Sequence, residues 1–185
     1  SGYYSFGIIN LQLCEGFNTA TFPPTNLTLT GTSTSYWSYN AVSGYGLGTG
    51  SARFNFYNLS SGSAQLTTLQ FDPSNVGDSL KFVLAHAYYG AGYIDTLKIE
   101  TSTNNGTNWT TIWTLWAQTN FTDPHSLSTV SQSPQFVPTS GQWKTMTYLM
   151  PTGTNKIRFN AISGYGNDMF IDSTCIKSAP PATLS

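Results

Sequence analysis

Two short stretches near opposite ends of the sequence each combine an acidic residue with a cysteine. Cys14 is followed directly by Glu15, and Asp172 stands three residues before Cys175; the chain has no other cysteine. In an oxidising compartment an even pair of cysteines is typical of a disulfide, and the alternative is two buried free thiols. We expect a disulfide that joins the first strand to the last, so that the two strands lie side by side.

These residues must be positioned by β-strands. Apolar and polar residues alternate with period two in several segments, and no 3.6-residue period is sustained over the length of a helix. We expect strands at residues 7–13, 36–39, 52–57, 65–71, 79–89, 93–102, 109–116, 142–150, 156–162 and 169–176. Residues 26–35 and 117–140 are expected to be polar loops. About ten short strands at regular spacing predict an all-β, two-sheet antiparallel sandwich.

The composition favours an extracellular protein. Only 8% of the 185 residues are charged and 15% are aromatic, against about 25% charged residues in an average domain. The net charge of -1 provides no basic surface for nucleic acid. No apolar run reaches the roughly 18 residues that a membrane span requires. We expect a secreted or cell-surface location.

The chain divides into three parts. Residues 1–10 are expected to form an apolar N-terminal arm or edge strand, residues 11–178 the β-sandwich, and residues 179–185 a Pro-containing tail or linker. An exposed sheet edge can accept a strand from another chain. The arm is therefore expected to contact another copy of the protein.

The order of several short motifs resembles a known family. The motifs are residues 14–17, 22–24, 80–82, 86–88, 95–99, 108–110, 136–138, 142–144, 157–159 and 165–172. In this order they resemble the MAM-like, choice-of-anchor jelly-roll domains of secreted and cell-surface Bacteroidetes proteins, which are often exported by type IX secretion. The resemblance implies a jelly roll whose first and last strands are neighbours. It also implies a calcium ion near that seam.

Four side chains are candidates to hold this calcium ion. Glu15 and Asp172 would come together if the cysteines pair, and Asn167 and Asp168 could add oxygens from the preceding loop. Calcium takes six to eight oxygen ligands, and two carboxylates at one seam repel unless a cation lies between them. The alternative is that both acids are exposed or accept backbone hydrogen bonds.

The sequence contains no recognisable catalytic motif. The sequence lacks the Gly-x-Ser-x-Gly elbow that is typical of α/β-hydrolases. It also lacks the His-Glu-x-x-His motif that is typical of zinc metalloproteases. His86 lies on the apolar face of its predicted strand and is expected to be a core histidine with satisfied hydrogen bonds. Asp95 is expected to bind loop backbone. We therefore expect a protein that is not an enzyme.

Tyrosines near Gly-rich turns are candidates for stacking on sugar rings. These are Tyr45, Tyr89, Tyr93 and Tyr165, because loops are the places where a rigid scaffold presents binding residues. The alternative is that most aromatic residues fill the core. Residues 41–46 and 161–166 are similar to each other, and each contains the sequence Ser-Gly-Tyr-Gly.

Five asparagines begin an Asn-x-Ser/Thr sequon, which is the acceptor sequence for N-glycosylation. They are Asn26, Asn58, Asn105, Asn108 and Asn120.

Two functions follow from these observations. The favoured one is a non-catalytic extracellular structural or adhesive protein that is a subunit of a cell-surface assembly or filament, with copies of itself or neighbouring surface modules as partners. The alternative is a calcium-stabilised carbohydrate-binding module of a larger secreted enzyme or adhesin, with a polysaccharide as its partner.

Overall fold

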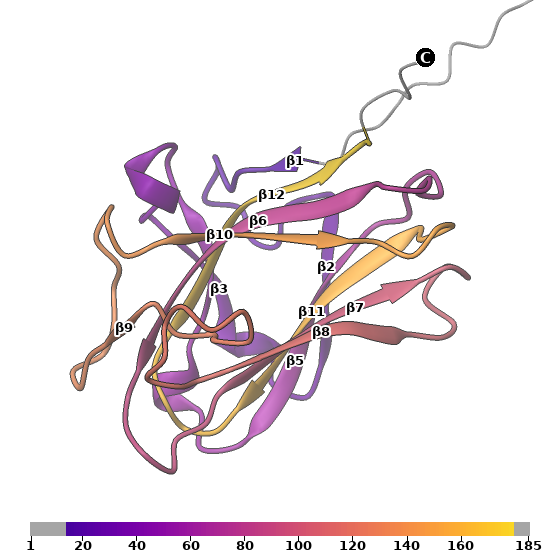
Figure 1. Cartoon of the computed structure of the whole chain (residues 1–185). Helices are drawn as coiled ribbons and strands as arrows, with labels where there is room; N and C mark the ends of the chain where they lie inside the picture. The colour runs from indigo at the N-terminus through magenta and orange to yellow at the C-terminus, as the bar shows by residue number, and fades with distance from the viewer. Residues whose placement is uncertain (1–13, 180–185) are drawn as a thin grey trace, which may run out of the picture.

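The computed structural model describes residues 14–179 as two β-sheets packed face to face (Figure 1). The seven-stranded sheet comprises β1 (Cys14–Glu15), β3 (Trp37–Asn40), β4 (Ser51–Phe54), β6 (Ser79–Tyr88), β9 (Val130–Ser131), β10 (Lys144–Leu149) and β12 (Met169–Lys177). The five-stranded sheet comprises β2 (Leu27–Gly31), β5 (Gly62–Thr68), β7 (Thr96–Ser102), β8 (Thr110–Trp116) and β11 (Lys156–Ser163). Three short 3-10 helices lie between strands: η1 (Thr34–Tyr36), η2 (Gly44–Gly46) and η3 (Phe56–Asn58).

The strand order is that of a jelly roll. One sheet contains β10-β6-β12-β4-β3 in this order, and the other contains β2-β5-β11-β7-β8, so that successive strands mostly alternate between the sheets. Among the named strands, all pairings are antiparallel except the two-residue pairing of β9 with β6. β1 pairs with β12, with Cys14 opposite Cys175. The predicted all-β sandwich with adjacent first and last strands is confirmed.

The core lies between the sheets and follows the period-two pattern. On β6, Leu80, Phe82 and Leu84 point inward and are fully buried. The ring of Phe82 packs edge-on against Phe159 of β11 at 5.1 Å between centroids, which links the two sheets. On the opposite face of β6, Val83, Ala85 and Ala87 are also buried, because Phe136 from the long connection before β10 packs against them.

Three expectations about secondary structure were wrong, and one of them is the loop expected at residues 117–140, which contains the two-residue strand β9. Residues 26–35 were expected to be a loop, but β2 pairs with β5 from Leu27 to Gly31, since its β-branched threonines suit an edge strand. The strand expected at residues 52–57 ends at Phe54. After Asn55 the chain forms the 3-10 helix η3 instead. The Asn55 side chain accepts a hydrogen bond of 3.1 Å from the Asn58 amide and so supports this turn.

The predicted N-terminal arm, residues 1–10, and most of the predicted tail lie outside the described residues. Between residues 14 and 179, no helix is long and apolar enough to cross a membrane.

Candidate functional site

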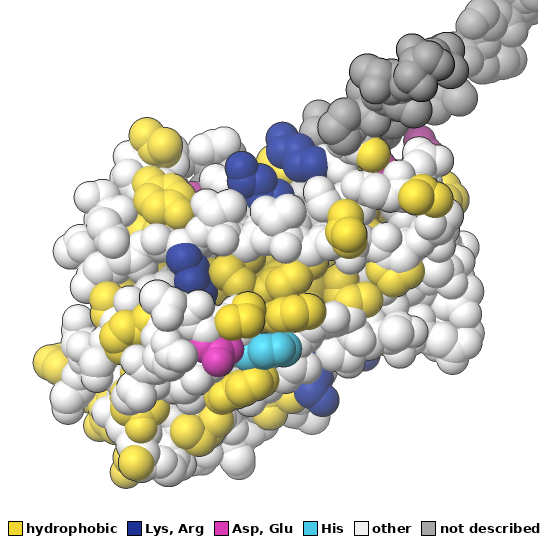
Figure 2. Space-filling model, in the orientation of Figure 1, with side chains coloured by type: hydrophobic (Ala, Val, Ile, Leu, Met, Phe, Trp, Pro, Cys, Tyr) yellow, Lys and Arg dark blue, Asp and Glu magenta, His cyan; other side chains and the backbone are white. Residues whose placement is uncertain are grey.

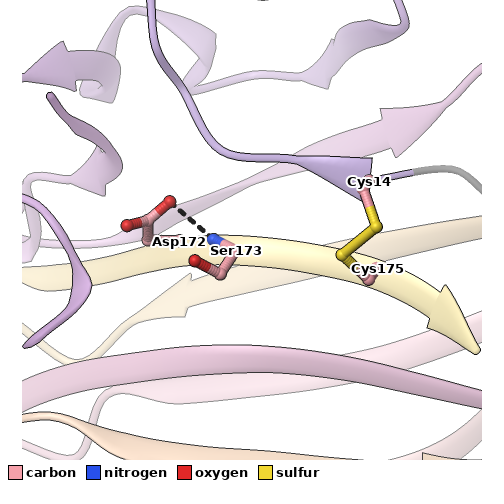
Figure 3. Close-up of a disulfide and its surroundings, with 4 residues drawn as sticks. All are labelled: Cys14, Asp172, Ser173 and Cys175. Carbon is pink, nitrogen blue, oxygen red and sulfur yellow. Dashed lines mark hydrogen bonds between the residues drawn. A yellow bond between two sulfur atoms is a disulfide. The ribbon is translucent and has the colours of Figure 1, made fainter. Parts of the chain in front are cut away.

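The seam between β1 and β12 carries the predicted cysteine pair. Cys14 and Cys175 form a disulfide that closes a loop of 161 residues (Figure 3). The bridge exists because the register of the two strands places these residues directly opposite each other. The structure therefore contains the disulfide and not the alternative pair of free thiols.

Asp172 is buried beside this seam and holds backbone amides. Its carboxylate accepts hydrogen bonds from the amides of Gly44 at 2.7 Å and Ser173 at 2.5 Å, the second of which is drawn in Figure 3. Burial raises the pKa of Asp172, the two amides lower it, and the nearby Glu15 carboxylate raises it further. The Glu15 carboxylate itself accepts a hydrogen bond of 2.6 Å from the Phe17 amide.

The four predicted calcium ligands do not gather in one place. Asp168 forms an ion pair with Arg53 at 2.5 Å, and the Asn167 side chain accepts a hydrogen bond of 2.7 Å from the Phe136 amide. Across residues 14–179, no three acidic, histidine or cysteine side chains cluster in a way that would hold a metal ion. Glu15 and Asp172 are the two of the four that lie near each other. Both accept backbone hydrogen bonds, as the alternative reading of the sequence expected, and calcium at this seam stays a prediction.

Asp95 is fully buried and binds the backbone of a distant loop. Its oxygens accept hydrogen bonds from the amides of Gly164 at 3.0 Å, Gly166 at 3.1 Å and Asn167 at 2.9 Å. This arrangement confirms the expectation that Asp95 binds loop backbone. A carboxylate that receives several amide hydrogen bonds is well compensated for its burial.

His86 lies between Asp95 and Ser128 in the core. Its Nε2 is 3.1 Å from Asp95 Oδ2 and its Nδ1 is 3.1 Å from Ser128 Oγ. A hydrolytic triad uses the opposite nitrogens and an exposed serine, whereas all three side chains here are buried. His86 is thus the satisfied core histidine expected from the sequence.

The two Ser-Gly-Tyr-Gly turns are held in the same way. The amide of Gly44 is bound by Asp172, and the amide of Gly164 by Asp95. The following tyrosines adopt left-handed backbone conformations, with φ of 55° at Tyr45 and 61° at Tyr165. Each turn therefore presents its tyrosine at the surface, where 40% of Tyr45 and 49% of Tyr165 are exposed.

A cluster of tyrosines forms around the second of these turns. The ring centroids of Tyr57 and Tyr89 lie 5.8 Å apart, those of Tyr89 and Tyr93 5.1 Å, and those of Tyr93 and Tyr165 6.2 Å. These four residues, called the tyrosine cluster below, line a hollow of about 140 Å³ together with Asn58 and Gly166.

The tyrosine cluster contains three of the four predicted aromatic residues. Tyr45 lies elsewhere, with its hydroxyl 3.0 Å from Thr145 Oγ1. Tyr57 was missed, because the sequence placed it inside a strand, whereas η3 turns it toward Tyr89. The sequon that begins at the adjacent Asn58 was the only feature of the sequence that indicated an exposed turn near Tyr57.

Four of the five sequon asparagines are exposed, and Asn26 is half-buried. Asn105 is exposed but its Oδ1 accepts a hydrogen bond of 2.7 Å from Asn155. Glycosylation of these residues stays a prediction.

A larger apolar groove of about 670 Å³ runs between β8 and β10, the edge strands of the two sheets. Figure 2 shows it as a continuous band of hydrophobic side chains across one face of the molecule. It is lined by Ile112, Trp113, Phe121, Thr122, Asp123, Pro124, Lys144, Thr145, Met146, Thr147, Tyr148 and Leu149. No pattern in the sequence predicted this groove.

The polar groups of the groove lie partly out of water. Burial lowers the pKa of Lys144 to about 8, against the opposing effect of the Asp123 carboxylate. Its ammonium donates hydrogen bonds to the carbonyls of Ser126 and Ser128. The ring of Trp113, which lines the groove, stacks on the ring of His125 with 4.5 Å between their centroids.

Comparisons with known proteins show the fold. No protein-family model matches the chain, and no curated protein matches it either. The K1 cleaved adhesin domain of Lys-gingipain from Porphyromonas gingivalis superposes with a TM-score of 0.63 at 16% identity, covering 91% of this chain and 99% of that one. The chain is thus an all-β sandwich of the kind found in that adhesin domain.

Carbohydrate-binding modules share the same sandwich. TmCBM61, solved with β-1,4-galactotriose, gives a TM-score of 0.52 at 17% identity, with coverage of 89% of this chain and 95% of that one. A family 22 module from Clostridium thermocellum gives 0.50 at 15% identity, with coverage of 93% and 95%. At such identities the likeness establishes the architecture alone. The ligand and the function have to be inferred from the residues of the site.

Proposed function

We propose that the chain is a non-catalytic, extracellular adhesive module that contacts carbohydrate through its tyrosine cluster. The observation that carries this proposal is the cluster itself. The four tyrosines come from three separate segments, since Tyr89 and Tyr93 share the connection between β6 and β7, and they meet around one hollow. Two of them are well exposed, Tyr93 at 39% and Tyr165 at 49%.

The chemistry of the hollow suits a sugar. The C–H face of a sugar ring packs against aromatic rings, and tyrosine hydroxyls and amides provide hydrogen bonds that fix orientation. Tyrosines offer this contact area at low conformational cost, since each has only two rotatable side-chain bonds. The side chain of Asn58 adds an exposed amide at the rim.

The structural neighbours support the proposal at the level of their fold. They include adhesin domains of Lys-gingipain and modules that bind β-1,4-galactotriose, mannan and xylan. These sugars are a rational first panel for this chain.

Secretion is supported by the disulfide and the low charge of the chain, since disulfides persist in oxidising compartments. The relationship to MAM-like domains and export by type IX secretion remain hypotheses. Calcium is proposed only at Glu15 and Asp172, where two carboxylates lie close enough for one to raise the pKa of the other.

The two Ser-Gly-Tyr-Gly turns provide a matched test. Tyr165→Ala and Tyr45→Ala change the same residue in the same backbone conformation, and only Tyr165 belongs to the tyrosine cluster. In affinity electrophoresis on galactan, mannan and xylan, Tyr165→Ala should weaken retention roughly tenfold, which corresponds to the loss of one buried aromatic contact. Tyr45→Ala should bind as the wild type does.

Equal binding by the wild type and both variants would show that the tyrosine cluster is not the carbohydrate-binding site. Failure of the wild type to bind any glycan of a broad array would contradict carbohydrate recognition itself.

A second candidate function is a subunit of a cell-surface assembly or filament. The observation that favours it is the open groove between β8 and β10, which leaves apolar side chains exposed along one side of the sandwich (Figure 2). Large exposed apolar patches mark interaction sites.

A further inference from the structure

The groove between β8 and β10 runs along the edge of a strand. Consecutive residues of a strand point to opposite faces of its sheet, yet all six residues from Lys144 to Leu149 line the groove. A groove that contacts both faces of β10 must follow its outer edge. Among the described residues, β10 pairs with β6 alone, so this edge is open to another strand.

The groove also exposes groups that such a strand would cover. Leu149 at its rim is 74% exposed, whereas Met146 at its base is nearly buried. The Tyr148 hydroxyl is buried and has no hydrogen-bond partner in the described part of the chain. A buried polar group without a partner is costly. An added strand would cover the apolar rim and could supply a partner for this hydroxyl.

One segment of the sequence has the pattern that this groove requires. Residues 3–9 carry no charge, and Tyr4, Phe6 and Ile8 alternate with Ser5 and Gly7. As a strand, this segment would direct the three large side chains to one face. We propose that residues 3–9 of a second copy of the chain add a strand to the outer edge of β10 and insert Tyr4, Phe6 and Ile8 into the groove.

Distance favours a second copy over the chain's own segment. Cys14 is fixed opposite Cys175, and β12, β6 and β10 follow in order across the sheet. A strand added beyond β10 would lie four strand spacings from β1, about 19 Å. The five residue steps from Ile9 to Cys14 span at most about 17 Å when fully extended. A strand from the same chain cannot cover this distance and also turn back into the groove.

The resulting contact is head-to-tail. Each copy contributes its N-terminal segment to one neighbour and its groove to another, so the two surfaces of a contact are different. Heterologous contacts of this kind build open chains unless the rotation between copies closes a ring. The bond is made by main-chain hydrogen bonds along β10 and by apolar side chains in the groove.

The test uses the full chain and two pairs of matched variants. On the segment, Phe6→Asn combined with Ile8→Asn changes the inserted face, and Ser5→Asn changes the opposite face. On the body, Leu149→Lys changes the groove rim, and Leu47→Lys changes a leucine of nearly equal exposure, 73% against 74%, outside the groove. Oligomer size is measured over a concentration series by light scattering and negative-stain electron microscopy.

We expect the wild type, Ser5→Asn and Leu47→Lys to assemble into chains or rings. The Phe6/Ile8 variant and Leu149→Lys should each associate at least about tenfold more weakly, since each places a polar or charged group in an apolar contact. Thermal melts confirm that each variant is folded.

Mixing the two defective variants is the decisive measurement. Leu149→Lys retains an intact segment and the Phe6/Ile8 variant retains an intact groove, so the mixture should form one-to-one heterodimers and no longer species. A wild type that stays monomeric at every concentration, or assembly that is equal in all variants, would overturn the proposal. Restored long chains in the mixture would contradict the single-groove geometry.

Discussion

The carboxylate of Asp172 accepts a hydrogen bond of 2.7 Å from the amide of Gly44, which lies 128 residues earlier in the chain. Asp95 makes the same contact with Gly164 at 3.0 Å. Both pairs join a buried acid in or beside a strand to the first glycine of a Ser-Gly-Tyr-Gly turn. The similarity of the two sequence segments therefore has a structural cause, because each acid fixes a turn that exposes a tyrosine.

The close contact at Gly44 predicts that even a methyl group is too large there. A Cβ at this position would overlap the Val83 side chain and approach Asp172 Oδ2 to 3.1 Å. Gly44→Ala should destabilise the fold by about 1–3 kcal/mol, the usual cost of overpacking. Gly141→Ala is the control, because no described atom lies within 4 Å of its Cβ. Urea unfolding that gives equal stability for both variants would contradict this account.

The raised pKa of Asp172 predicts how stability varies with pH. Because burial raises the folded-state pKa above its ordinary value of 3.8, the folded state binds this proton more tightly than the unfolded state. The protonated Asp172 therefore contributes to the stability of the fold. This contribution is fully present below the ordinary pKa of 3.8 and is lost as the pH rises through the folded-state pKa.

Asp172→Asn cannot ionise and should remove this part of the pH dependence. The measurement is urea unfolding of the wild type and variant from pH 3 upward, in chelator to exclude bound metal. Parallel stability curves for the two proteins would show that Asp172 does not titrate as described.

Calcium at the seam predicts a response to chelation. If an ion bridges Glu15 and Asp172, a chelator should lower the melting temperature of the wild type, since a ligand that binds only the folded state stabilises it. Glu15→Gln removes one of the two carboxylates and should abolish the response. If the chelator leaves the melting temperature of the wild type unchanged, the calcium proposal is wrong.

The disulfide predicts a large loss of stability on its removal. Cys14→Ser with Cys175→Ser opens a loop of 161 residues, and the loss of a native bridge typically costs about 2–5 kcal/mol. Denaturant unfolding of the double variant, compared with the wild type under oxidising conditions, measures this cost. A change in stability within experimental error would mean that the pairing of β1 with β12 contributes little to the fold.

Lys144 predicts a change of stability at alkaline pH. Its folded-state pKa of about 8 lies below the ordinary value of 10.5, so the folded state loses this proton first. Its contribution should make the fold more stable as the pH rises from 8 toward 10.5. Lys144→Met should lack this rise relative to the wild type, and Lys81→Met, an exposed residue on β6, should keep it. An equal rise in both variants would assign it to other groups.

The sequence by itself determined the class of fold and several of its details. Alternation along residues 79–89 placed Leu80, Phe82 and His86 on the inner face, as the structure confirms. This success has a physical reason, since a period of two is a property of each strand alone. The adjacent first and last strands followed from the cysteine pair together with the family resemblance.

Only the tertiary structure decided which side chains meet. Asn167 was expected to bind calcium, but it holds the Phe136 amide on a loop whose path no local pattern describes. Tyr57 joined the tyrosine cluster because a 3-10 turn replaced the end of a strand. The groove arises where the edges of β8 and β10 face each other across two sheets. Periodicity shows that a strand has two faces, and the packing of the whole chain decides which neighbour covers each face and which edge stays open.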